Sequence, residues 1–257
     1  MFKEITSREN SLIKLTSELQ RSSKKRQETG LFVLEGLRIC KDAHDNGIRF
    51  DKLIISKTAE NRYISDIRAF EKISNECYIL PDSLFKKISE TESPQGIIAL
   101  ALKPQEISVD FKKGRFVALE NIQDPSNLGA VARSAEALGA DGILISKNSC
   151  DPFAPKSIRA SMGTLLRIPV IVLDDFIGDI KKFGLKTFAC VVDRDAMSIC
   201  DASFSDGCAV LIGNEANGLT LETVNSSDFS VTIPMKGKAE SLNASVAAAI
   251  AIWEMTI

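Results

Sequence analysis

Apolar residues recur along the first hundred positions with two alternating periods. Segments with apolar residues three and four positions apart are typical of amphipathic helices, and they alternate with short β-branched runs that are typical of strands. Strands separated by helices predict an α/β sandwich. The expected helices cover residues 11–20, 37–47, 64–74 and 81–90, and the expected strands cover 31–35, 52–56, 77–80 and 96–102.

A second series of the same kind begins near residue 115. It predicts a strand at 115–120 and then a helix over Asn127–Leu138, which Ser126 or Asn127 caps. A terminal helix at 241–255 is apolar on most sides, so we expect it to be buried, and a second copy of the chain would cover it. Further buried strands are expected at 142–146, 169–173, 187–192, 208–213 and 229–234.

The segment between the two series follows neither period. Lys103–Gly114 has little apolar periodicity and contains Pro104, which is typical of a linker. We therefore expect an N-terminal domain at 1–103, a linker at 104–114 and a C-terminal domain at 115–257.

Composition excludes several classes of protein. With 257 residues, of which 44% are hydrophobic, and a formal net charge of −2, the chain has the composition of an ordinary globular protein. The sequence lacks the apolar run of about 18 residues that a transmembrane helix needs, and its first residues lack the apolar stretch of a secretory signal. We therefore expect a cytoplasmic protein with no membrane partner.

Cysteine and histidine usage excludes further classes. The six cysteines lie far apart and form no CxxC pair, so neither a zinc ribbon nor a disulfide framework is indicated, and no metal site is expected. The single histidine, His44, precedes an Asn46-Gly47 helix stop, where a solvated position is expected rather than a catalytic one. Sites that need two or three imidazoles are excluded.

The charges are distributed unevenly. Residues 1–106 carry 18 basic and 16 acidic side chains, whereas residues 107–257 carry 14 and 18. The first 26 residues alone hold seven basic and three acidic side chains, which gives a local charge of +4. The low overall charge argues weakly against nucleic-acid binding, yet this basic segment has the charge to contact phosphates. A solvated helix face is the alternative interpretation.

Three polar loops in the C-terminal half each follow a predicted strand. In an α/β sheet, the loops at the carboxyl ends of the strands form the crevice where ligands bind. The first loop holds Asn121, Gln123, Asp124 and Asn127 before a helix that carries Arg133. The second, GNEANG at 213–218, needs positive-φ positions and contains one carboxylate. The third, which follows Pro234, contains Lys236 and Lys238, and Ser241 or Asn243 begins the terminal helix.

These three loops resemble, in order and spacing, the three motifs of the SpoU family, the RNA 2′-O-ribose methyltransferases of the SPOUT superfamily. The first motif appears as Asn127, Gly129 and Arg133, and the second as Gly213, Asn214, Glu215 and Gly218. The third appears as Ile233, Pro234, Met235, Ser241, Leu242, Asn243 and Ser245. The resemblance implies an α/β fold with a C-terminal trefoil-knot domain that binds S-adenosylmethionine and forms a homodimer.

The resemblance also implies roles for individual residues. The implied catalytic set is Asn127, Arg133, Glu215, Ser241 and Asn243, and the implied cofactor contacts are Gly213, Asn214, Ile233, Met235 and Leu242. Because a guanidinium stays protonated in proteins, we expect Arg133 to bind a phosphate and stabilise developing negative charge rather than act as the base. The two asparagines are expected to orient groups around it. Glu215 is expected to hold Arg133 or to accept the proton, and Ser241 to hydrogen-bond the reacting region.

The N-terminal half resembles the substrate-binding domain that precedes many of these enzymes, an L30e-like α/β/α sandwich that binds RNA. The resemblance rests on residues 5–19, the basic segment 21–26, and the FVLEGLRI segment around Glu35 and Gly36. Structured ribosomal RNA is the expected substrate. The expected RNA contacts are Arg21, Lys24, Lys25 and Arg26 in this half, and Lys236 and Lys238 in the other.

Three other functions stay open at the level of sequence. A tRNA 2′-O-methyltransferase would carry the same motifs. A catalytically silent RNA-binding scaffold would keep the fold, although the complete set of motif residues disfavours it. A nucleotide-dependent oxidoreductase on a doubly wound fold is disfavoured because no glycine fingerprint follows the first strand.

Overall fold

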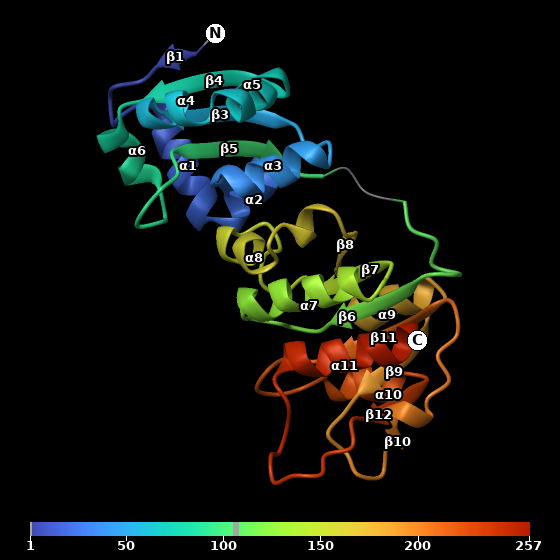
Figure 1. The fold of residues 1–257 in the computed structure, drawn as a ribbon. Helices are drawn as coiled ribbons and strands as arrows, with labels where there is room; N and C mark the ends of the chain where they lie inside the picture. Colours follow the sequence, from blue (N-terminus) through green and yellow to red (C-terminus); the bar gives the residue numbers. More distant parts are fainter. Residues whose placement is uncertain (1, 105–107) are drawn as a thin grey trace. The chain divides into compact units, whose positions relative to one another are not determined.

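The chain forms two compact units, each with its own sheet (Figure 1). The computed structural model describes residues 2–104 and 108–257, so residues 105–107 of the predicted linker lie outside the described residues. Unit 1 comprises residues 1–105 and 153–159, and unit 2 comprises residues 106–152 and 160–257. No helix in the described part of the chain is long and apolar enough to cross a membrane.

Unit 1 contains a five-stranded mixed sheet in the order β1-β4-β3-β5-β2. Strand β5 pairs antiparallel with both β2 and β3, and the other pairs are parallel. The elements are β1 (Lys3–Glu4), α1 (Ser11–Arg21), α2 (Ser23–Thr29), β2 (Leu31–Glu35), α3 (Leu37–Asp45), β3 (Phe50–Ser56), α4 (Lys57–Arg62), α5 (Ile64–Lys72), β4 (Ser74–Leu80), α6 (Asp82–Ile88) and β5 (Ile97–Leu102). The second segment of unit 1 includes most of α8 (Pro155–Ala160).

Helices pack on both faces of this sheet, because the strand side chains alternate between two apolar layers. On one face, Leu12 and Leu19 of α1 and Phe85 of α6 pack in a buried cluster with Val33 of β2. On the other face, α3 and α5 pack together, and Phe70 of α5 meets the ring of Phe50 edge to face. The predicted α/β/α sandwich is confirmed.

The basic segment after α1 is helical, although it shows no apolar periodicity. Ser22 caps α2 by accepting a hydrogen bond from the backbone N–H of Lys25, and Gly30 ends the helix in the left-handed region at φ 66°. Two capping residues thus define a helix of only seven residues, too short for a periodic pattern to reveal.

Unit 2 contains a seven-stranded sheet in the order β10-β12-β9-β11-β6-β7-β8, and all of its pairs are parallel. Its elements are β6 (Arg115–Leu119), α7 (Pro125–Ala137), β7 (Gly142–Ser146), η1 (Thr164–Leu166), β8 (Val170–Leu173), α9 (Phe176–Lys182), β9 (Lys186–Cys190), β10 (Met197–Ser198), η2 (Ile199–Asp201), β11 (Cys208–Ile212), α10 (Leu221–Ser226), β12 (Phe229–Thr232) and α11 (Ala244–Thr256).

The central strands of this sheet are buried on both faces. Phe116 of β6 and Leu211 of β11 pack against α9 in one apolar cluster, while α7 and α11 lie side by side over the opposite face (Figure 1). Phe111, inside the predicted linker, stacks on Phe183 with ring centroids 4.1 Å apart, so this residue belongs to the core of unit 2.

Helix α7 begins two residues earlier than the sequence predicts. Asp124 is its N-cap, accepting a hydrogen bond from the backbone N–H of Ser126 at 2.9 Å, and Pro125 takes the first helical position. The prediction that Ser126 or Asn127 caps this helix is therefore wrong. Asn127 lies inside the first turn, with its side chain available for a contact outside the helix.

Candidate active site

The three motif loops lie at one edge of the unit 2 sheet. They follow β6, β11 and β12, and strands that run parallel bring their carboxyl ends to the same edge. Gly129 of the first motif allows a close approach in α7, because a Cβ added there would lie 2.6 Å from the backbone nitrogen of Ser161.

A chain of side-chain amides joins all three motifs. Asn243 caps α11 with its Oδ1 and donates its Nδ2 to Oδ1 of Asn127 at 3.1 Å. Asn127, which is 8% exposed, donates its own Nδ2 to Oε1 of Glu215 at 2.8 Å. Each amide uses its oxygen and its nitrogen in different bonds, so the three loops are held in a fixed arrangement.

Glu215 accepts further bonds from the backbone that leads into α7. The N–H groups of Gln123 and Asp124 each donate to its carboxylate at 3.3 Å. Partial burial acts to raise the pKa of Glu215, but the hydrogen bonds from Asn127 and from backbone N–H groups outweigh it and hold the pKa below its ordinary value. A carboxylate held in the ionised form by these donors is a poor proton acceptor, so the expectation that Glu215 takes the proton is not supported.

The GNEANG loop closes tightly on itself. Asn214 and Gly218 form an antiparallel bridge with backbone bonds of 3.0 and 2.9 Å. A Cβ at Gly213 would lie 2.0 Å from the carbonyl carbon of Gly218, so only glycine fits at this position. The side chain of Asn214 accepts from the N–H groups of Ala216 and Asn217 and donates to the carbonyl of Asn121 at 2.8 Å.

Asn121 connects the first loop to the neighbouring strand in a left-handed backbone conformation. Its φ is 55°, uncommon for a residue with a side chain and frequent at functional sites. Its N–H donates to Oγ of Ser146 at 2.8 Å, and its carbonyl also accepts a bond from the side chain of Gln123. The polar cluster of the first loop therefore shapes the loop backbone.

A buried carboxylate holds the start of α10, directly after the second loop. Glu120, the residue that follows β6, is 5% exposed and accepts from the N–H of Thr220 at 2.8 Å and from the hydroxyls of Thr220 and Thr223. Sequence reasoning missed this residue. The signal was an acidic side chain at the end of an otherwise apolar strand, a position where burial requires hydrogen-bond partners.

A cleft opens beside these loops, between the ends of β9 and β12 and the start of α11. Its walls are mostly apolar and include Val191, Val192, Ile233, Met235, Leu242 and Ala247. Its polar lining consists of Cys190, Thr232, Glu240 and Ser241. Three predicted cofactor residues and the predicted catalytic Ser241 are thus brought together, whereas Gly213 and Asn214 are not among the described residues that line the cleft.

Arg133 lies apart from this cleft within the described chain. It is exposed on α7, and no hydrogen bond or ion pair to another described residue holds its guanidinium. Glu215 is instead bonded to Asn127 and to the α7 entry, so the expectation that it holds Arg133 is not met. Arg133 is therefore free to meet an external anionic group.

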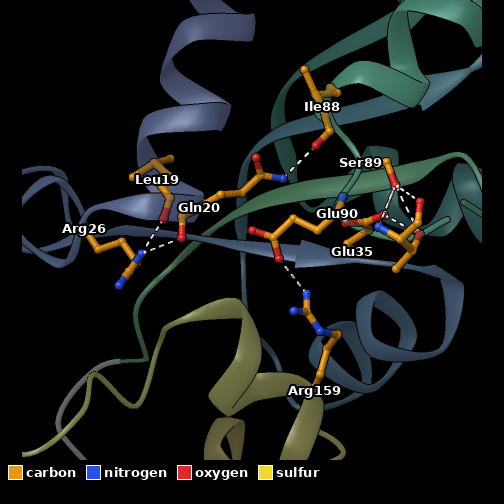
Figure 2. A network of polar contacts seen from close by, with 9 residues as sticks. Leu19, Gln20, Arg26, Glu35, Ile88, Ser89, Glu90 and Arg159 are labelled. Atoms are coloured by element: carbon orange, nitrogen blue, oxygen red, sulfur yellow. Dashed lines mark hydrogen bonds and ion pairs between the residues drawn. The ribbon is translucent and has the colours of Figure 1, made fainter. Parts of the chain in front are cut away.

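In unit 1, the basic residues expected to contact RNA divide into two kinds. Arg21 and Lys24 are exposed, and Lys25 lies 3.2 Å from Glu18. Arg26 is only 3% exposed, and its Nη1 donates to the carbonyls of Leu19 and Gln20 near the end of α1 (Figure 2). The prediction of an RNA contact at Arg26 is therefore wrong, because this guanidinium serves the helix terminus.

The Glu35-Gly36 pair of the N-terminal resemblance also has a structural role. Glu35, at the end of β2, accepts from the hydroxyls of Ser89 and Thr91 and from the N–H of Glu90 at 3.0 Å (Figure 2). Gly36 adopts φ 109°, which favours glycine. The bonds of Glu35 hold the loop that leads from α6 to β5.

The two lysines of the third loop are exposed to solvent. Lys236 and Lys238 are exposed, as the predicted RNA contacts require. Sequence reasoning missed Glu240 in the same loop, and it also missed Cys190 at the end of β9. Burial raises the pKa of the Cys190 thiol to about 12, so it lines the cleft as a neutral group.

Family models match both halves of the chain. A model of the SpoU rRNA methylase family matches residues 114–253, and a model of the MRM3-like substrate binding domain matches residues 10–99. The chain is 29% identical over 255 residues to the 23S rRNA (guanosine(2553)-2′-O)-methyltransferase RlmP of Bacillus subtilis, a match that covers 98% of this chain and 99% of the relative. It is 28% identical over 266 residues to the 23S rRNA (uridine(2479)-2′-O)-methyltransferase of Streptomyces viridochromogenes, covering 97% and 90% of the two chains.

The fold matches solved structures of the same group. The AdoMet-bound rRNA methyltransferase from Sinorhizobium meliloti superposes with a TM-score of 0.87 and 25% identity, over 99% of this chain and 97% of that one. The predicted fold class, an α/β sandwich followed by a SPOUT methyltransferase domain, is confirmed. With its family model matching more than half of its length, the chain belongs to the SpoU rRNA methylase family.

Proposed function

We propose that this chain methylates a ribose 2′-hydroxyl of ribosomal RNA with S-adenosylmethionine as the methyl donor. The observation that carries the proposal is the convergence of all three SpoU motifs on one edge of the sheet, joined by the Asn243, Asn127 and Glu215 bonds. Two relatives that cover nearly the whole chain are named for 2′-O-methylation of 23S rRNA, which favours ribosomal RNA over tRNA. An rRNA substrate is consistent with a cytoplasmic enzyme.

The residues of the cleft fit S-adenosylmethionine. Adenine and the methyl-bearing sulfonium require apolar walls with few polar groups, and Ile233, Met235 and Leu242 supply such walls. When bound, this cofactor supplies an activated methyl group on a good leaving group. Gly213 and Asn214 contribute indirectly, by closing the loop that borders the site. Ser241 places a hydroxyl in the same lining, where it hydrogen-bonds the reacting region.

Arg133 has the central role toward the RNA. Its exposed guanidinium binds a phosphate next to the target ribose and stabilises the negative charge that develops on the 2′-oxygen. Asn127 and Asn243 act as positioning residues, because their amides hold the α7 and α11 termini together. Glu215 anchors the first loop and leaves the proton to another acceptor.

Exposed basic residues of unit 1, together with two lysines of unit 2, bind the RNA. Arg21, Lys24 and Lys25 present positive charge on α1 and α2, and Lys236 and Lys238 present it beside the cleft. In this proposal residues 1–103 form the substrate-binding domain and residues 115–257 form the catalytic domain.

The active form is a homodimer that buries one face of α11. Val246 and Trp253 lie seven positions apart on this helix and are 47% and 52% exposed, although the helix is apolar on nearly all sides. Residues at this spacing share one helix face, so they form an apolar stripe suited to a second copy of the chain. Arg133 does not line the cleft of its own chain. In a homodimer, Arg133 of one chain would complete the cleft of the other chain.

Label transfer from tritiated S-adenosylmethionine to total RNA tests the proposal. The expected result is label in 23S rRNA and none in tRNA, with transfer lost in Arg133→Ala while binding of the cofactor is kept. Label in tRNA would favour the tRNA enzyme. Binding of both RNA and cofactor without any transfer would identify a scaffold.

A further inference from the structure

The acidic side chain of Glu240 is an unusual feature of the cleft. The other described residues that line it are uncharged, including Cys190, whose thiol is neutral because burial raises its pKa to about 12. No ion pair joins Glu240 to a lysine or arginine in the described part of the chain, although Lys236 and Lys238 lie in the same loop. Glu240 is exposed to solvent, and it is the single charged residue among the described residues that line the cleft.

We propose that Glu240 selects the cationic cofactor over its neutral-sulfur product, so that the cleft favours S-adenosylmethionine over S-adenosylhomocysteine. The inference rests on the proposed function, because it assumes that this cleft holds the cofactor. It assigns to Glu240 a role in binding specificity rather than in the chemical step.

The electrostatic argument depends on what differs between the two ligands. Both carry the same adenosine, ammonium and carboxylate groups, and only the cofactor carries a positive sulfonium. Because Glu240 is exposed, solvent screens its attraction for a cation, and the charge pair is worth no more than about 1 kcal/mol, which is about fivefold in affinity. A carboxylate in the lining therefore adds affinity for the sulfonium and adds none for the thioether.

The same difference governs release of the product. During transfer the ribose oxygen forms a C–O bond to the methyl carbon, the S–C bond breaks with its electron pair left on sulfur, and the hydroxyl proton leaves to an acceptor. The positive charge that Glu240 attracts disappears at that step. S-adenosylhomocysteine is then bound less tightly than a new molecule of S-adenosylmethionine. This difference limits product inhibition.

Isothermal titration calorimetry with three ligands tests the inference. The ligands are S-adenosylmethionine, S-adenosylhomocysteine and sinefungin, an unreactive analogue with a cationic amine in place of the sulfonium. Glu240→Gln is expected to weaken binding of the two cationic ligands by about 2- to 5-fold, as for a solvent-exposed charge pair, and to change S-adenosylhomocysteine by less than about 1.5-fold. Glu240→Asp keeps the charge and is expected to retain most of the preference.

Glu222→Gln is the matched control, because it removes the same charge from an exposed position on α10 outside the cleft. It should leave all three affinities unchanged. An unmutated protein also gives a test: its preference for the cationic ligands should fall as salt is raised. Equal weakening of all three ligands in Glu240→Gln, or no change in any, would overturn the inference. Wild-type protein that binds no S-adenosylmethionine would overturn the proposed function itself.

Discussion

Asn127 donates its side-chain amide to Glu215 at 2.8 Å, although the two residues are 88 positions apart in the sequence. The bond connects the first and second SpoU motifs across the sheet edge, and Asn243 extends it to the third. The geometry of the site therefore depends on a short series of amide and carboxylate contacts more than on any single catalytic side chain.

Replacing Asn127 with alanine should affect both stability and turnover. The change leaves the side chains of Glu215 and Asn243 without this partner, and an unsatisfied polar group costs about 1–3 kcal/mol. We expect a decrease of that size in the free energy of unfolding, measured by denaturant titration, and a fall in kcat larger than any rise in KM. Asn217→Ala, in the exposed part of the GNEANG loop, is the control and should change neither. Equal effects of the two substitutions would argue against the role of this contact.

The Glu215 carboxylate predicts a pH dependence of stability. Its pKa in the folded chain is lowered from the ordinary 4.5, so the folded state favours its ionised form. The stability that it contributes is fully present above about pH 4.5 and is lost as the pH falls through the lower folded pKa. The difference in unfolding free energy between wild type and Glu215→Gln should therefore be constant from pH 6 to 8 and shrink below about pH 4.5. A difference that instead grows on acidification would show that the pKa is raised.

Gly213→Ala should disrupt the second motif. The added Cβ would lie 2.0 Å from the backbone of Gly218, so the closed loop has to open. Strain of this kind costs about 1–3 kcal/mol, and we expect weaker binding of S-adenosylmethionine together with a lower Tm. Gly237→Ala is the control, since a Cβ there meets nothing within 4 Å. Unchanged cofactor affinity in Gly213→Ala would mean that the loop does not shape the cleft.

The basic residues of unit 1 should separate into RNA contacts and a structural arginine. Arg21→Ala and Lys24→Ala each remove an exposed charge, so each should weaken binding of rRNA and reduce the salt slope of log K by about 1. Arg26→Ala leaves the carbonyls of Leu19 and Gln20 without their donor, so it should lower Tm and leave the salt slope of the folded protein unchanged. Binding of S-adenosylmethionine should be unaffected by Arg21→Ala and Lys24→Ala. A reduced salt slope in Arg26→Ala would contradict the assignment.

Trp253→Glu should separate the proposed homodimer. A charge in the middle of an apolar interface is costly, so we expect a monomer by analytical ultracentrifugation and a large loss of methyl transfer. Leu221→Glu, at a side chain that is 79% exposed on α10, is the matched control and should remain dimeric. A dimeric Trp253→Glu variant would place the interface elsewhere.

Much of the fold could be predicted because unit 2 is built from parallel strands buried on both faces. Continuous apolar runs such as those of β6 and β11 are a strong signal, and each was predicted to within a residue or two. The short α2 gave no such signal, and the start of α7 was misplaced because the Asp124-Pro125 capping pair was overlooked.

The sequence predicted which loops form the site, but it did not predict which side chains bond to each other there. Motif order indicated which loops converge, since parallel strands place their carboxyl ends together. That Glu215 binds Asn127 and not Arg133, and that Arg26 turns inward to the end of α1, depends on tertiary packing between residues distant in sequence. A count of charges along the chain cannot distinguish a buried arginine from an exposed one, which is why the basic segment was assigned to RNA as a whole.

Mapping of 2′-O-methyl groups across ribosomal RNA tests the central claim most directly. RNA from cells with and without this gene would be compared by nucleoside mass spectrometry and by primer extension at limiting nucleotide concentration. We predict one 23S rRNA position that is methylated on its ribose only when the gene is present, restored by the wild-type gene and not by Arg133→Ala. Identical methylation patterns in the two strains, or a gene-dependent methyl group on a base, would contradict the account.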